Sequence, residues 1–196
     1  MIKYYKKSDN GIVEIEKPEK DCWINVHPPF DHKRLATLSD AIDIPIDYLL
    51  DSIDINERSR FEQDDNVKLI VTNIPIENDM ENSIDNDAFY ITIPIGIILT
   101  NDYNIIISSA QNKVIDWFFS IAIKHLSPNE KEMIVMKIFE KNVFYFIQYQ
   151  LYTIYLPSRW RQSAHFFGAP NRCGYLYCDK GQKGDFLQYN LIYFGP

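Results

Sequence analysis

The stretch that decides the fold is residues 44–76, IPIDYLLDSIDINERSRFEQDDNVKLIVTNIPI. Its first part has apolar residues at helical spacing after Pro45, a residue type that suits the first turn of a helix. Its last part, from Val67, is a mixed apolar run typical of a strand. An acidic connector joins the two, and within it Arg58 and Glu62 would pair if the connector formed a helical turn. The stretch therefore predicts a helix, a charged elbow and a strand in direct succession.

Two segments before this stretch predict strands. Residues 2–6 and 11–15 are β-prone and are separated by an Asn-Gly pair, which supplies the positive φ angles of a hairpin turn. Residues 22–26, CWINV, predict a buried strand that ends at two prolines, because proline cannot donate to a ladder.

A second hairpin is predicted after the stretch and an acidic loop at residues 77–87. Every odd position of residues 89–99 is apolar, which is the period of a strand. Pro94 and Gly96 within it suggest an edge or a bulge. A turn then leads to residues 103–108, which predict an antiparallel partner.

Three further segments have helical periodicity. Asp31 is placed to cap the first, whose apolar positions are Leu35, Leu38 and Ile42. The second begins near Asn112. The third begins with a capping box and runs to about residue 156. Its apolar stripe, which we interpret as core, consists of Met133, Met136, Phe139, Val143, Phe146, Ile147, Leu151 and Ile154.

Composition narrows the functional class. The net charge of -7 argues against a nucleic-acid or anionic-membrane binder, because such partners select basic surfaces. Three scattered cysteines and the lack of a signal-peptide pattern predict a reducing compartment, which places this chain in the cytoplasm. No phosphate loop, nucleophile elbow or zinc-protease motif occurs, so we do not expect an enzyme.

The order and spacing of these segments resemble the amino-terminal cytoplasmic domain of the CorA family of magnesium transporters. In that family a Trp-Ile-Asn strand leads into a helix, an Ile-Pro…Leu-x-Asp helix follows, and an Arg-x-[Lys/Arg]-x-Glu elbow enters a sheet. The matching residues are Trp23-Ile24-Asn25, Ile44-Pro45 with Leu50-Asp51, and Arg58-Ser59-Arg60-Phe61-Glu62. The resemblance covers residues 1–156 and implies an α/β domain with a mixed or antiparallel sheet flanked by helices.

The resemblance also implies a function and one metal-binding residue. Intact members form a homopentamer with a membrane pore, and some are regulated by Mg²⁺ held between an acidic residue on the Leu-x-Asp helix and a carboxylate of the neighbouring subunit. The matching position is Asp51. Mg²⁺ keeps much of its water and is held by one or two carboxylates, so an aspartate suits this role. A solvated helix residue is the alternative, and the sequence does not choose among magnesium, cobalt, nickel and zinc.

The family's long charged helix, its two transmembrane helices and its Gly-Met-Asn motif are not present in this sequence. The neighbour's carboxylate would lie on that long helix, so Asp51 is half of a regulatory site. We expect this chain not to transport ions by itself and to be monomeric or weakly associating. The runner-up interpretation is a soluble α/β protein-interaction module unrelated to transport.

Residues 157–196 differ from the rest of the chain. Only two of the 27 acidic residues lie there, and five of the seven glycines do. We predict an irregular tail that does not match the family, and a natural truncated variant, an artificial junction or a shifted reading frame would each explain it. We favour the shifted frame. His165, Cys173 and Cys178 are possible zinc ligands, but their spacing matches no standard zinc site.

Overall fold

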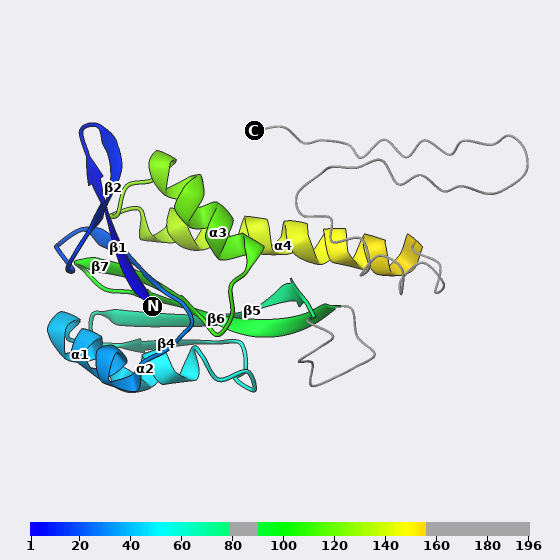
Figure 1. The fold of residues 1–196 in the computed structure, drawn as a ribbon, viewed down its shortest axis with the longest axis horizontal. Coiled ribbons are helices and arrows are strands. Elements are labelled where there is room, and N and C mark those ends of the chain that lie inside the picture. Colours follow the sequence, from blue (N-terminus) through cyan, green and yellow to red (C-terminus); the bar gives the residue numbers. More distant parts are fainter. Residues whose placement is uncertain (79–89, 156–196) are drawn as a thin grey trace, which may run out of the picture. The chain divides into compact units, whose positions relative to one another are not determined.

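The computed structural model describes residues 1–78 and 90–155, which form a mixed β-sheet with helices on both faces (Figure 1). The strands are β1 (Ile2–Ser8), β2 (Gly11–Ile15), β3 (Cys22–Val26), β4 (Arg60–Asp64), β5 (Val67–Glu77), β6 (Tyr90–Leu99) and β7 (Tyr103–Ser108). The helices are α1 (His32–Ile42), α2 (Ile46–Asp51), α3 (Lys113–Ser120), the 3₁₀ turn η1 (Ala122–His125) and α4 (Lys131–Tyr155). The predicted tail and most of the predicted acidic loop at 77–87 lie outside the described residues.

The seven strands are arranged in the order β2-β1-β3-β7-β6-β5-β4. Strands β3 and β7 pair in parallel, and every other neighbouring pair is antiparallel. The parallel pair joins the amino-terminal antiparallel strands, in which β1 lies between β2 and β3, to the β4–β7 meander. The predicted α/β class with a mixed sheet is confirmed.

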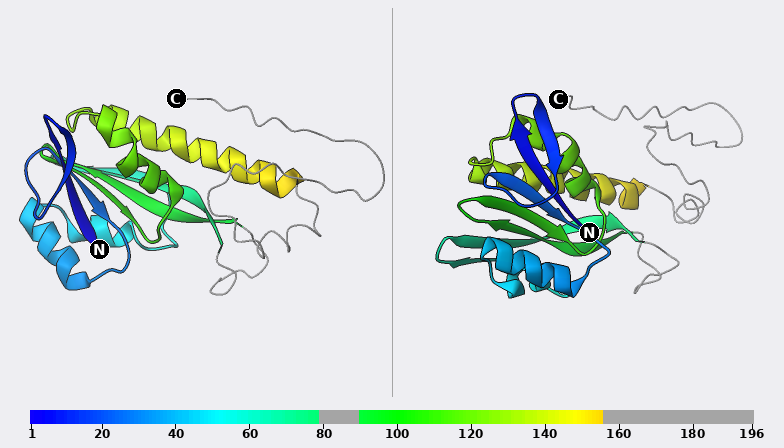
Figure 2. Two further views of the ribbon diagram at one scale, coloured as in Figure 1. Left: turned by 45° about the horizontal axis from the view of Figure 1, so that its top comes forward. Right: turned by 60° about the vertical axis from the view of Figure 1, so that its left-hand side comes forward.

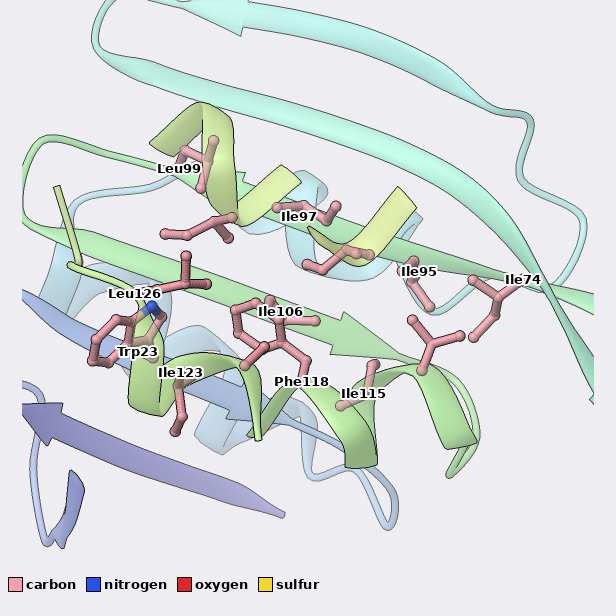
Figure 3. Close-up of a cluster of buried hydrophobic side chains, with 14 of the residues drawn as sticks. Trp23, Ile74, Ile95, Ile97, Leu99, Ile106, Ile115, Phe118, Ile123 and Leu126 are labelled. Atoms are coloured by element: carbon pink, nitrogen blue, oxygen red, sulfur yellow. The ribbon is translucent and has the colours of Figure 1, made fainter. Parts of the chain in front are cut away.

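One hydrophobic core lies between the sheet and the helices α3 and α4 (Figures 2 and 3). Strand β6 contributes Ile95, Ile97 and Leu99, which point to this face because alternate side chains of a strand share a face. Phe118 of α3 and Trp23 of β3 are fully buried beside them. The alternation predicted for residues 89–99 is thus confirmed from Ile93 onward.

A second core lies on the opposite face of the sheet, under α1 and α2 (Figure 1). Strand β7 supplies side chains to both cores, with Ile106 in the first and Ile105 and Ile107 in the second. The central strands are therefore buried on both faces, which explains why their sequences are almost continuously apolar.

The helix starts follow the sequence signals. Oδ1 of Asp31 accepts a hydrogen bond from the backbone N–H of Lys33 at 2.9 Å, so Asp31 caps α1 as predicted. Oε2 of Glu130 accepts from the backbone N–H of Ser127 at 2.6 Å, as in a capping box. Helix α4 itself begins later, at Lys131.

The charged elbow is not a helical turn, so the condition for an Arg58–Glu62 pair is not met. Residues 60–64 form β4, an edge strand that is antiparallel to β5. Arg58 is exposed, and it is Arg60 that pairs with Glu62. In a strand, residues two apart point to the same side, which brings Arg60 and Glu62 together.

Neither Pro94 nor Gly96 marks a bulge, because the register between β5 and β6 runs without a break. Pro94 lies just beyond the last β6–β7 pair, Ile95 with Ser108, so its missing N–H falls where β6 has no neighbour on that side. Gly96 is a position of close helix approach, since a Cβ there would lie 1.9 Å from Oγ of Ser52.

The apolar stripe predicted as the core face of α4 is largely its exposed face. Ile134 and Ile138 are buried, and with Asn142 and Tyr149 they form the side that faces the sheet. The opposite side is named here the outer face of α4, and its exposed members are Met133, Met136, Phe139, Val143, Phe144, Ile147 and Leu151. The helix is apolar on most of its circumference, so periodicity alone did not identify the buried side.

Candidate functional site

The predicted metal residue Asp51 lies at the end of α2, on the outside of the helix. Leu49 anchors α2 against the sheet with no exposed surface, and Ser52 is equally buried, its Oγ donating to the carbonyl of Tyr48 at 2.6 Å. The Asp51 side chain is 39% exposed. Its carboxylate therefore reaches solvent, as a metal ligand on this helix requires.

Three carboxylates surround one guanidinium at this position, and we name this group the Arg60 cluster: Asp51, Glu57, Arg60 and Glu62. Nη2 of Arg60 donates to Oδ2 of Asp51, and Nε donates to Oε1 of Glu62, each at 2.6 Å. Nη1 makes an ion pair with Oε1 of Glu57 at 2.5 Å without the geometry of a hydrogen bond. The cluster has a formal charge of -2, since one cation faces three anions.

The Arg60 guanidinium is held firmly by these partners. Its side chain is 23% exposed, and this partial burial disfavours the charged form. The hydrogen bonds that Arg60 donates to Glu62 and Asp51, with the nearby Glu57 charge, outweigh that cost, so that the pKa of Arg60 is raised. Arg60 stays protonated at every physiological pH and acts as a built-in counter-ion for Asp51.

Each carboxylate of the Arg60 cluster is paired with the guanidinium. The three carboxylates are spread around the guanidinium, and within residues 1–78 and 90–155 no three His, Cys, Asp or Glu side chains are grouped to hold a metal. Asp51 thus fits a single-ligand role, in which Mg²⁺ keeps most of its water. A cation that binds Asp51 would compete with Arg60.

A second acidic feature is an open groove of about 580 Å³ where three connections meet. Its aspartates are Asp43, Asp64, Asp65 and Asp102, from the α1–α2 link, the β4–β5 turn and the β6–β7 turn. Asp102 is paired with Lys20 at 2.8 Å. The groove was not predicted from the sequence because its aspartates are far apart in the chain. The only sequence signal is that each of the three connections carries an aspartate.

The other candidate ligands do not gather. The histidines His27, His32 and His125 belong to no metal-binding group among the described residues. The possible zinc ligands of the tail, His165, Cys173 and Cys178, lie outside the described residues.

Comparison with known proteins gives structural matches only. No protein-family model and no curated protein sequence matches the chain. Among solved structures, the soluble domain of CorA from Methanocaldococcus jannaschii superposes with a TM-score of 0.54 at 19% identity, covering 77% of this chain and 61% of that one. The fold is that of the CorA soluble domain.

Two further structures agree with this assignment. The complete CorA magnesium transporter from M. jannaschii matches with a TM-score of 0.50 at 21% identity, covering 62% of this chain and 36% of that chain. The ZntB cytoplasmic domain from Vibrio parahaemolyticus matches with a TM-score of 0.51 at 14% identity, covering 74% of this chain and 60% of that chain.

The matched proteins are longer than the matched region. This chain spans about a third of the complete CorA chain and about three fifths of the two domain structures. Within the residues that the structure describes, no helix has the length and apolar character needed to cross a membrane. One neighbour is named as a magnesium transporter, and the other two are named as the soluble domain of CorA and the cytoplasmic domain of ZntB.

Proposed function

We propose that residues 1–156 are a cytoplasmic regulatory domain of a CorA-like transporter of divalent cations, with residues 157–196 as a separate tail. The observation that carries this proposal is the fold: a seven-stranded mixed sheet with α1 and α2 on one face and α3 and α4 on the other, which superposes on CorA and ZntB domains. The domain binds and responds to the ion, and a membrane pore conducts it.

Asp51 is the residue through which this domain meets the ion. It lies on the helix where the family resemblance places the regulatory carboxylate, and its side chain is solvent-accessible. With no cation bound, Arg60 neutralises it at 2.6 Å. A hydrated Mg²⁺ and the Arg60 guanidinium would bind the same carboxylate oxygens of Asp51. The ion must therefore displace Arg60, and its binding to this chain alone is weak.

A titration with MgCl₂ by isothermal calorimetry tests this role, with NaCl at equal ionic strength as the reference. Asp51→Asn weakens Mg²⁺ binding about threefold, because a charged oxygen ligand is lost. Arg60→Gln strengthens binding, because it frees the Asp51 carboxylate. Asp47→Asn is the matched control, since Asp47 lies in the first turn of the same helix and is exposed.

Three outcomes contradict the proposal. Tight binding that Asp51→Asn leaves unchanged removes Asp51 from the site. An Arg60→Gln variant that binds Mg²⁺ no better than the parent shows that Arg60 does not compete with the ion. If none of the variants binds Mg²⁺ at all, the regulatory role itself is wrong.

The protein-interaction module stays a second candidate because one observation favours it. The outer face of α4 exposes large apolar side chains, with Met136 61% and Val143 56% accessible. An apolar surface of this kind is typical of sites where another protein binds.

A further inference from the structure

The ammonium group of Lys141, on α4, is surrounded by three aromatic rings. The rings belong to Trp117, Phe144 and Tyr145, and we name them the Lys141 cage. Their centroids lie 5.2 Å, 4.3 Å and 5.3 Å, respectively, from Nζ of Lys141. A cation is attracted to a ring face within about 6 Å, and single contacts of this kind occur roughly once per 70–80 residues. Three rings on one cation are therefore a concentrated cation site.

The cage is held by packing between two helices. Phe144 and Tyr145 follow Lys141 by three and four residues, positions that are neighbours on the surface of a helix. Their rings are inclined at 78° with centroids 5.3 Å apart, so they form two walls. Trp117 comes from α3, which lies beside α4 (Figure 2), and both Trp117 and Tyr145 pack against the first core. Phe144 is 50% exposed, which leaves the cage open to solvent on that side.

The charge of Lys141 is not paired with a carboxylate. Within residues 1–78 and 90–155, its ammonium group makes no hydrogen bond or ion pair, and the adjacent Glu140 is paired with Lys137 at 2.8 Å. Lys113, which lies over a single ring, has an ion pair with Glu77 at 2.6 Å. An ammonium group carries three N–H donors, and ring faces accept hydrogen bonds only weakly. The Lys141 cage therefore suits a cation that has fewer N–H groups than lysine itself.

We propose that Lys141 is a site of Nζ-methylation and that the Lys141 cage binds the resulting dimethyl- or trimethylammonium group. Methylation keeps the positive charge of lysine and replaces its N–H donors with methyl groups. A methylated ammonium is the type of cation that aromatic cages recognise. Here the cage and its ligand belong to the same chain, so the modification would strengthen the contact between α3 and α4. This inference is independent of the proposed transport role.

The reaction needs a methyl donor of the sulfonium class and a separate methyltransferase that binds it. Lys141 first releases a proton to solvent, and the lone pair of the neutral amine then attacks the methyl carbon. The new N–C bond forms as the C–S bond breaks, and the sulfonium becomes a neutral thioether. Burial lowers the pKa of Lys141, with the Glu140 charge opposing this, so more of the neutral amine is present than at a solvated lysine. Lys141 is itself partly exposed, which gives the donor access.

Peptide mass spectrometry of the whole chain, purified from its native cells, tests the modification. We expect two or three methyl groups on Lys141 and none on Lys137. Lys137 is the matched control, because it lies one turn earlier on α4 and is paired with Glu140 instead of with aromatic rings. Lys141 without methyl groups in these cells overturns the methylation and leaves the cage as a structural contact between the two helices.

Reductive methylation of the purified chain, with isotope-labelled formaldehyde and a borane reductant, tests the cage. This reaction converts lysines to dimethyllysines, whose methyl signals are resolved by NMR and assigned with Lys141→Arg and Lys137→Arg. The Lys141 methyl signals should lie upfield of those of Lys137, because they lie over ring faces. Phe144→Leu, at a half-exposed site, should reduce this shift, since it removes the nearest ring.

Phe139→Leu is the control for that variant, because Phe139 is an exposed aromatic residue of α4 outside the cage, and it should leave the shift unchanged. Methyl signals of Lys141 that coincide with those of Lys137 would show that the rings do not hold the methylated cation. A shift that Phe144→Leu leaves intact, or that Phe139→Leu reduces equally, likewise overturns the assignment of the cage.

Discussion

Gly96 is a position where one missing atom sets the distance between two elements. It lies in β6, with α2 directly above it, and a Cβ would lie 1.9 Å from Oγ and 2.5 Å from Cβ of Ser52. Ser52 follows α2 and is fully buried, so it has little room to move. The sequence pattern places a glycine in a strand and predicts an edge or a bulge, whereas in the structure the glycine lets the helix that carries Asp51 lie close to the sheet.

Gly96→Ala should therefore destabilise the fold by about 1–3 kcal/mol, the range for overpacking a filled core. The free energy of unfolding in urea, followed by circular dichroism, measures this cost. In a Ser52→Gly background the same change should cost less, because the atoms that clash with the new methyl group are gone. An equal cost in both backgrounds would show that the contact with Ser52 is not its cause.

Asp51 illustrates how far residue-level reasoning reaches. Its place on the outer side of a helix follows from the apolar spacing around it, and the structure agrees. Its partner Arg60 could not be found by helical spacing, because the two residues come together only when residues 60–64 form a strand. If residues 60–64 are assigned to a strand, Arg60 and Glu62 are two apart and point to the same side, so their ion pair can be predicted from the sequence.

At the scale of elements, the strands with apolar runs and the edge strand β2, marked by its Asn-Gly turn, were predictable, and the other edge strand, β4, was not. Residues 93–99 alternate cleanly because they divide their side chains between two cores. Strand β4 carries Arg, Phe, Glu, Gln and Asp, and most of it is exposed, so it has neither alternation nor a continuous apolar run. Edge strands commonly carry charged residues, because these oppose pairing with other chains.

The start of β6 contacts α4 through two stacked tyrosines. This contact makes the free energy of unfolding depend on pH. The rings of Tyr90 and Tyr149 have centroids 4.3 Å apart. Burial, together with the nearby Glu77 carboxylate, raises the pKa of Tyr90 to about 12. The unfolded chain loses this proton near pH 10 and the folded chain keeps it, so the contribution of Tyr90 to stability is present below pH 10 and is lost as the pH rises toward 12.

The Tyr90→Phe variant should accordingly lose less stability between pH 10 and pH 12 than the parent, by about 1 kcal/mol after allowance for solvent screening. Urea unfolding at pH 10, 11 and 12 measures the difference. Tyr103→Phe, which removes a phenol at the start of β7 and away from α4, serves as the control. If parent and Tyr90→Phe lose stability in parallel over this range, the contact does not titrate as described.

At the scale of the whole molecule, the topology lay beyond what local patterns determine. Periodicity predicts hairpins between neighbours in the chain, such as β6 with β7, but not the parallel pairing of β3 with β7 across 76 intervening residues of sequence. The resemblance to the CorA domain supplied the fold class, and the superposition on its soluble domain agrees. The acidic groove and the outer face of α4 became apparent only from the assembled fold.

The sheet order also predicts how stability is distributed across the whole chain. Strands β6 and β7 lie in the sheet interior and are buried on both faces, whereas β2 and β4 are edges with mostly exposed side chains. Amides exchange through openings whose free energy rises with buried contacts. In native-state hydrogen exchange by NMR, the amides of β6 and β7 should therefore exchange last, near the global unfolding limit, and those of β2 and β4 much earlier. Edge amides as slow as those of β6 would mean that another chain or segment covers the edges.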